Sequence, residues 1–220
     1  MMNKGAVPLE RVEDKNVRLS ANEARQGKGF KLHTDSNGTH KTLANITGDR
    51  IKISMRAPGG RLSLRVREQN RLQTSEALRV PLPLQIGKRK TDGKRSVLCL
   101  GPDEWVIRTP CEDVQALLQK SELLRDATPH SLVDVSSRDV EIDISGRDVE
   151  AVLSAGCPID FRQFSVGEGK RTIFDSVQII LDRHTDTDFS IEVWRSYSAY
   201  IWEGLALAID DVNAESFLAE

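Results

Sequence analysis

The sequence has few of the residues on which reactive sites and membrane segments depend. Its 220 residues include 3 cysteines, 4 histidines and 5% aromatic residues. Cys99, Cys111 and Cys157 follow no paired spacing, so we expect free thiols. The apolar runs fall far short of the roughly 20 residues of a membrane-spanning helix, and residues 1–10 lack the apolar stretch of a secretory signal. We therefore expect a cytoplasmic protein with no membrane partner.

Charge of one sign dominates each half of the chain, although the net charge is only -2. Residues 1–100 carry 21 Lys and Arg against 9 Asp and Glu, a net charge of +12, and residues 101–220 carry 10 against 24, a net charge of -14. A basic half can bind nucleic acid, but opposite halves equally favour intramolecular pairing or docking on an acidic protein. No aromatic residue lies between Arg50 and Arg71, so a stacking platform for single strands is missing and nucleic acid is a disfavoured partner.

Residues 1–48 predict a flexible basic and polar arm, because they are rich in Asn, Lys, Gly, Ser and Thr and contain one aromatic residue, Phe30. Two roughly equal structured halves are expected to follow, residues 49–128 and residues 129–220. Alternation in 51–55 and 62–66 around the turn at 57–60 predicts a hairpin or two adjacent strands. A short helix is expected within 68–80, ended by Pro81 and Pro83.

The strongest hairpin signal is the pair of strands 96–100 and 105–107 around a turn at 101–104, with Trp105 expected in the core. A helix follows from Glu112, with one buried face formed by Val114, Leu117, Leu118, Leu123 and Leu124. In the second half we expect strands at 132–135, 140–144, 172–174, 177–181 and 189–193, and helices at 149–155 and 200–209. Short hairpin connections favour an α+β fold made of two similar halves, each an antiparallel sheet with helices.

No catalytic constellation or metal site can be assembled from local spacing. His33, His40, His130 and His184 are scattered, and ordinary surface or hydrogen-bonded histidines explain them better than metal ligands do. Cys157 is a possible nucleophile, but nothing near it in the sequence would lower its pKa, so a small buried apolar role is favoured.

Three further patterns have ordinary structural explanations. Residues 167–170 lack the spacing of a phosphate-binding loop and predict a turn before a strand. The basic run 87–95 predicts a solvated loop. Asp134, Glu141 and Asp143 alternate along strands, which predicts the solvent-facing side of a half-buried sheet.

The sharpest local feature is residues 192–202, which hold two of the three tryptophans and both tyrosines. Aromatic residues beside arginine are typical of interface hot spots, so we expect this segment to contact a partner. Core packing is an equally good explanation for Trp194 and Trp202, and a mixture of the two is expected. The predicted contact residues are Trp194, Arg195, Tyr197, Tyr200 and Trp202.

Five segments, in order, resemble the gamma subunit of heterotetrameric sarcosine oxidase. They are Leu-Gly-Pro-Asp-Glu-Trp (100–105), Val-Asp-Val-Ser-Ser-Arg (133–138), Gly-Cys-Pro-Ile-Asp (156–160), Arg-Thr-Ile-Phe (171–174) and Ile-Glu-Val-Trp-Arg-Ser-Tyr (191–197). The resemblance covers about residues 60–204. Family members tend to have shorter starts than the basic arm of this chain, so the resemblance implies no role for the arm.

The resemblance implies a fold like the folate-binding domains of the glycine-cleavage aminomethyltransferase. It also implies an alpha-beta-gamma-delta complex that demethylates sarcosine to glycine, passes the one-carbon unit to tetrahydrofolate and reduces O2 to H2O2. In the family FAD, FMN, NAD and the folate site are attributed to the alpha and beta subunits and zinc to the delta subunit. This chain would then be a non-catalytic gamma subunit that holds no cofactor of its own and stabilises the assembly.

Two alternatives stay open. The first is a stand-alone tetrahydrofolate-binding protein like the aminomethyltransferases, but Arg183-His184-Thr185-Asp186 stands where those relatives carry a Tyr-x-Gly-Glu-type segment. Related iron–sulfur maintenance proteins carry Lys-Gly-Cys, whereas Ala155-Gly156 precedes Cys157 here. The second alternative is a nucleic-acid-binding or scaffold protein that uses the basic first half.

Overall fold

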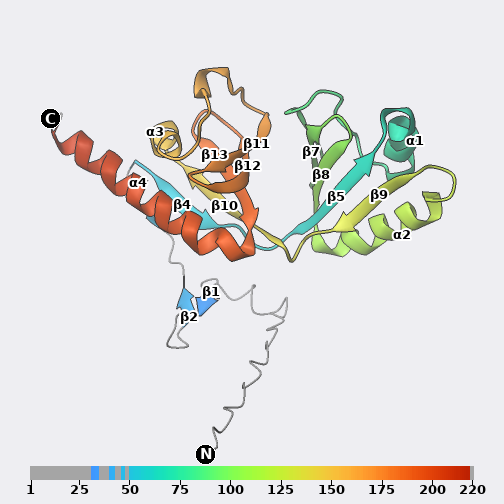
Figure 1. Cartoon of the computed structure of the whole chain (residues 1–220), viewed down its shortest axis with the longest axis horizontal. Helices are drawn as coiled ribbons and strands as arrows, with labels where there is room; N and C mark the ends of the chain where they lie inside the picture. The colour runs from blue at the N-terminus through green and yellow to red at the C-terminus, as the bar shows by residue number, and fades with distance from the viewer. Residues whose placement is uncertain (1–30, 35–39, 43–45, 48–49, 219–220) are drawn as a thin grey trace, which may run out of the picture.

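Two antiparallel sheets, each covered on its outer side by helices, form the body of the protein (Figure 1). The structure is a computed structural model, which describes residues 31–34, 40–42, 46–47 and 50–218. Most of the predicted arm, residues 1–48, lies outside the described residues. Within the arm, β1 (Lys31–Thr34) pairs with β2 (His40–Thr42), and β3 (Ile46–Thr47) joins the larger sheet.

The five-stranded sheet has the order β6-β7-β8-β5-β9 and carries α1 (Glu68–Leu78) and α2 (Val114–Leu124) on its outer face. Its strands are β5 (Gly60–Val66), β6 (Arg89–Asp92), β7 (Arg95–Gly101), β8 (Glu104–Thr109) and β9 (His130–Asp134). The predicted hairpin around residues 101–104 is confirmed as β7 and β8. The basic run 87–95, predicted as a loop, instead forms β6 and its turn to β7, because an edge strand leaves its charged side chains in water.

The six-stranded sheet has the order β11-β12-β13-β10-β4-β3 and packs α3 (Val149–Ser154) and α4 (Ser198–Leu218) on its outer face. Its other strands are β4 (Lys52–Met55), β10 (Asp139–Ser145), β11 (Gly169–Phe174), β12 (Val177–Arg183) and β13 (Asp188–Trp194). The predicted turn before this strand is confirmed at 166–167, where Gly167 has φ +84°, but residues 169–170 belong to β11 instead of to the turn. No helix in the described part of the chain is long and apolar enough to cross a membrane.

The two sheets exchange one strand each across the predicted boundary between residues 128 and 129. β4 pairs with β10 in the six-stranded sheet, whereas β9 pairs with β5 in the five-stranded sheet. The strands predicted at 51–55 and 62–66 are confirmed as β4 and β5, but their pairing as a hairpin was wrong, because residues 56–59 cross from one sheet to the other. Ile51 and Ile53 decide the placement of β4, because both are buried in the core of the six-stranded sheet.

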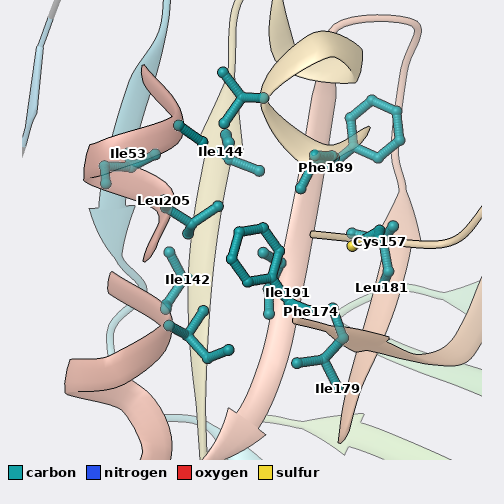
Figure 2. Packing of buried hydrophobic residues seen from close by; sticks show 14 of the residues in the cluster. Ile53, Ile142, Ile144, Cys157, Phe174, Ile179, Leu181, Phe189, Ile191 and Leu205 are labelled. Carbon is teal, nitrogen blue, oxygen red and sulfur yellow. The ribbon is translucent and has the colours of Figure 1, made fainter. Parts of the chain in front are cut away.

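Each sheet has its own apolar core between its outer face and its helices. In the six-stranded sheet, Ile142 lies close to Leu205 of α4, and Leu181 lies on the other side of the cluster beside Cys157 (Figure 2). In the five-stranded sheet, Leu62 and Leu64 alternate toward α1 and α2. The two cores explain why the chain forms an α+β fold of two similar halves, as predicted.

Trp105 lies in the core of the five-stranded sheet, and its Nε1 donates a 2.9 Å hydrogen bond to the Pro83 carbonyl. α2 buries Val114 and Leu117 as predicted, but Leu123 is 88% exposed. Leu123 faces solvent because it lies on the side of α2 opposite Val114 and Leu117.

The two sheets also meet at their edges. Lys88 and Glu168 form an isolated antiparallel bridge, and the Gly169 amide donates a 2.8 Å hydrogen bond to the Gly87 carbonyl. A Cβ atom at Gly169 would lie 2.6 Å from the Leu98 side chain and 2.7 Å from Oδ1 of Asp182. Glycine at this position therefore permits the close approach of the sheets.

Candidate functional site between the two sheets

The inner face of the five-stranded sheet presents a buried arginine, Arg61, and a largely buried one, Arg108, to the other sheet. Arg61 follows Gly60 at the start of β5, and because side chains alternate along a strand it points away from the core side of Leu62. Arg108 stands beside it on β8, as the register partner of Arg61. Two adjacent guanidinium groups repel each other when they are buried, so this arrangement needs carboxylates from elsewhere.

The inner face of the six-stranded sheet supplies those carboxylates from Glu141 on β10, Asp182 on β12 and Glu192 on β13. Arg61 donates from Nη2 to Glu141 Oε2 at 2.6 Å and from Nε to Glu192 Oε2 at 2.9 Å. Arg108 donates from Nε to Glu192 Oε2 at 2.9 Å and from Nη2 to Asp182 Oδ2 at 2.7 Å. All four bonds run from one sheet to the other, so the arginines fasten the sheets together.

Glu141 and Glu192 are direct cross-strand neighbours on β10 and β13, where like charges are unfavourable. Arg61 offsets this repulsion because its guanidinium group bonds both carboxylates at once. A charge-assisted hydrogen bond of this kind is roughly twice as strong as a neutral one.

Two more arginines and a histidine complete the network at its rim. Arg56 pairs with Glu141 and Asp143. Arg89, on the edge strand β6, lies 3.4 Å from Asp182 Oδ1 and donates from Nη1 to Nδ1 of His184 at 2.8 Å. Since Arg89 is a donor only, Nδ1 accepts, and Nε2 of His184 donates to Ser190 Oγ at 2.8 Å. His184 is therefore neutral and held in one tautomer.

The pKa values follow from this arrangement of charges. Burial alone would raise the pKa of Glu141, but the positive charges of Arg108, Arg56 and Arg61 outweigh it and lower that pKa to about 2. Burial, together with the nearby charge of Arg89, lowers the pKa of His184 to about 4. The network brings four arginines opposite four acidic side chains, so groups of opposite sign are matched in number.

Such a network has little capacity for chemistry of its own. Each carboxylate already accepts from an arginine, and Glu192 Oε1 is the one buried carboxylate oxygen of the network that has no hydrogen-bond partner within the described residues. A general base needs an unpaired group within reach of a substrate proton, whereas these groups neutralise one another. The arrangement is that of a structural ion-pair lock between the sheets.

The prediction of a solvent-facing side for Asp134, Glu141 and Asp143 was wrong for Glu141, which is buried. Its side of β10 faces the other sheet, so arginines take the place of water. Asp134 is exposed as predicted, and Asp143 is partly buried beside Arg56.

Cys157 occupies the small buried position that the sequence favoured. It belongs to the core of the six-stranded sheet, and burial raises the pKa of its thiol to about 12. Nearby residues line an open pocket of about 590 Å³, among them Pro158, Asp160 and Arg162. Asp160 is engaged by Arg162 and caps a short 3-10 turn, so this pocket brings no free reactive group to the thiol.

Two of the histidines lie in hydrogen bonds, as expected for non-ligands. His130 bonds Ser121 Oγ at 2.7 Å and the Thr128 carbonyl at 2.6 Å, and His184 belongs to the network above. His33 and His40 are on β1 and β2, whose side chains lie outside the described residues. Within the described residues, no three His, Cys, Asp or Glu side chains are placed to hold a metal ion.

The aromatic segment is divided between surface and core. Trp194, Tyr197 and Tyr200 are 48%, 45% and 47% exposed, whereas Trp202 is 5% exposed and packs in the core. Trp202 is thus no surface contact, because its face of α4 turns toward the sheet. Arg195 is partly buried, and its Nε donates to the Ser137 carbonyl at 3.0 Å.

Comparisons with known proteins agree with this fold. The model of the family described as "Sarcosine oxidase, gamma subunit family" matches residues 72–215. Among solved structures, the chain resembles one of the heterotetrameric sarcosine oxidase from Corynebacterium sp. U-96 in complex with pyrrole 2-carboxylate. The TM-score is 0.69 at 24% identity, over 76% of this chain and 88% of that one. No curated protein sequence matches the chain.

A second likeness is to the glycine cleavage system aminomethyltransferase T from Bartonella henselae, with a TM-score of 0.54 at 12% identity. It covers 72% of this chain and 46% of that one, so this chain spans about half the length of that enzyme. The architecture is therefore an aminomethyltransferase-like α+β fold whose inter-sheet region is filled by paired charges. The chain belongs to the sarcosine oxidase gamma subunit family, which confirms the resemblance seen in its five sequence segments.

Proposed function

We propose that this chain is the non-catalytic gamma subunit of a heterotetrameric sarcosine oxidase. The complex demethylates sarcosine to glycine, passes the one-carbon unit to tetrahydrofolate and reduces O2 to H2O2. Family membership supports the place in the complex. The observation that carries the non-catalytic role is the inter-sheet network, in which Arg61 and Arg108 are bound to the chain's own carboxylates.

The cofactors of the complex belong, in this proposal, to its other subunits. FAD, FMN, NAD and the folate site are assigned to the alpha and beta subunits, and zinc to the delta subunit. The buried arginines of the described residues are already paired with carboxylates, so they offer no free cationic site to the anionic groups, and no three His, Cys, Asp or Glu side chains of these residues are placed to hold zinc. An added anion such as a nucleotide phosphate or a folate carboxylate would have to displace Glu141, Asp182 or Glu192 from a buried pair, which costs several kcal/mol by rough estimate.

In this proposal the chain has a structural role in the complex. The ion-pair lock holds two sheets as one unit, and the exposed aromatic side chains of 194–200 offer a surface to a neighbouring subunit. The complex is assigned to the cytoplasm.

The test is co-expression of the chain with the alpha, beta and delta genes. We expect a stable flavin-containing complex that includes this chain, whereas the chain alone is colourless and has no oxidase activity. Isothermal titration of the isolated chain with tetrahydrofolate distinguishes the aminomethyltransferase-like alternative from the proposed non-catalytic role. Binding in the micromolar range would support that alternative and overturn the non-catalytic assignment. Heat changes no larger than those of dilution would agree with the non-catalytic assignment.

A further inference from the structure

Four large apolar side chains are exposed on consecutive elements of the chain, from the end of β13 to α4. Trp194 ends β13, Tyr197 follows it in the turn Arg195–Tyr197, and Tyr200 and Leu207 stand on α4. The rings of Trp194 and Tyr197 are 6.2 Å apart. Tyr200 is three residues beyond Tyr197, and Leu207 is two helical turns beyond Tyr200, so all four share one side of the molecule. We name them the aromatic stripe.

The rings of the stripe are held in place before any partner arrives. The Arg138 guanidinium group lies 5.8 Å from the Trp194 ring centre and is itself fixed by bonds of 3.0 and 3.1 Å to Asp139. The Tyr200 hydroxyl donates to Asp175 in the turn between β11 and β12. Side chains that are already ordered lose little entropy on binding, which is a property of interface anchors.

The chain's own core does not require the stripe. α4 buries Ile201, Leu205 and Ile209 against the six-stranded sheet, whereas Leu207, on the other side of the helix, is 67% exposed. A single exposed leucine is ordinary, but four neighbouring exposed apolar residues, three of them aromatic, mark an interaction surface.

The charged side chains of α4, the helix that carries Tyr200 and Leu207, are all acidic. α4 contains four acidic residues and no Lys or Arg among its 21 residues. Asp210 and Asp211 are exposed in the turn that follows Leu207. The helical part of the surface, from Tyr197 to Asp211, is about 21 Å long at 1.5 Å per residue.

We propose that the aromatic stripe binds another subunit of the oxidase through a surface that surrounds an apolar centre with Lys and Arg. The inference rests on the proposed function. It adds which face of this chain makes the contact and which charge the partner surface carries. Charge complementarity favours a subunit with a basic surface, because the acidic helix α4 steers and orients a basic partner. A second copy of this chain would place two acidic helices face to face.

The test uses the full-length tagged chain and the flavin-bearing subunits co-expressed with it. One variant combines Tyr197→Ser with Leu207→Ser, and a second combines Asp210→Lys with Asp211→Lys. Matched controls carry Leu123→Ser, an exposed leucine on α2, and Glu112→Lys with Asp126→Lys, two exposed acidic residues beside α2. Co-purification and the Kd at 50 and 500 mM salt are measured, with circular dichroism to verify folding.

We expect both stripe variants to bind the subunits at least about 10-fold more weakly and the controls to bind as the wild type does. The Asp-to-Lys variant should also lose most of the salt dependence. Wild-type affinity in both folded stripe variants would overturn the inference while the proposed function stands. Absence of any complex with the wild-type chain would overturn both, and loss of self-association instead of subunit binding would assign the stripe to a second copy.

Discussion

Arg108 on β8 donates a 2.7 Å hydrogen bond to Asp182 on β12, and this bond joins the two sheets. Asp182 has no exposed surface, and burial of both partners removes the water that would otherwise solvate their charges. Removing one charge from such a pair leaves the other buried and unpaired, so the pair couples the sheets energetically.

The first prediction concerns this pair. Arg108→Met should lower the free energy of unfolding by about 3–5 kcal/mol, because Asp182 and Glu192 lose a shared buried counter-charge. Urea unfolding followed by circular dichroism measures the loss. Arg125→Met, which removes an exposed pair with Glu122 on α2, should change stability by less than about 1 kcal/mol. Equal effects of the two substitutions would contradict a lock between the sheets.

The second prediction concerns pH. The pKa of His184 is about 4 in the folded chain against 6.5 for a free histidine, so the unfolded chain binds more protons between these values. The resulting stability is present above pH 6.5 and is lost as the pH falls toward 4. His184→Gln keeps an acceptor for Arg89 and a donor for Ser190 but does not titrate. Its unfolding free energy should therefore fall less than that of the wild type over this window, and parallel curves would refute the assignment.

The third prediction concerns the thiols. Cys111 is exposed, whereas burial raises the pKa values of Cys99 and Cys157. Ellman's reagent should modify one thiol per folded chain quickly and all three after denaturation. Cys111→Ser should abolish the fast phase. Fast modification of Cys157 in the folded chain, detected by mass spectrometry, would restore that residue as a candidate nucleophile.

Local patterns predicted most elements because each depends on nearby residues. A turn signal between apolar runs identified β7 and β8, alternation identified β10 and β13, and helical spacing identified α2. The predicted pairing of β4 with β5 was wrong. Proximity in the sequence favours β5 as its neighbour, but the pairing depends on which core Ile53 enters. α4 continues beyond the predicted end at residue 209, since nothing in the following residues stops a helix.

The inter-sheet network could not be predicted because alternation reveals two faces of a strand and not what covers the second face. Glu141 on a polar face is consistent with water or with another sheet. One available signal was missed. Arg61 on β5 and Arg108 on β8 also alternate with apolar residues, so each strand places an arginine on the face away from its core. The surface position of Trp194 and the core position of Trp202 likewise depend on the direction in which α4 leaves the sheet.

The most direct test of a non-catalytic chain is the turnover of sarcosine per bound flavin in the assembled complex. The measurement compares the wild type with complexes that carry His184→Gln or Glu141→Gln in this chain and still contain all subunits. We expect kcat and KM within about 2-fold of the wild type, because the proposed function places the substrate and cofactor sites in the other subunits. A fall in kcat of roughly 100-fold or more in a fully assembled complex, the size expected for a lost acid or base, would contradict the account.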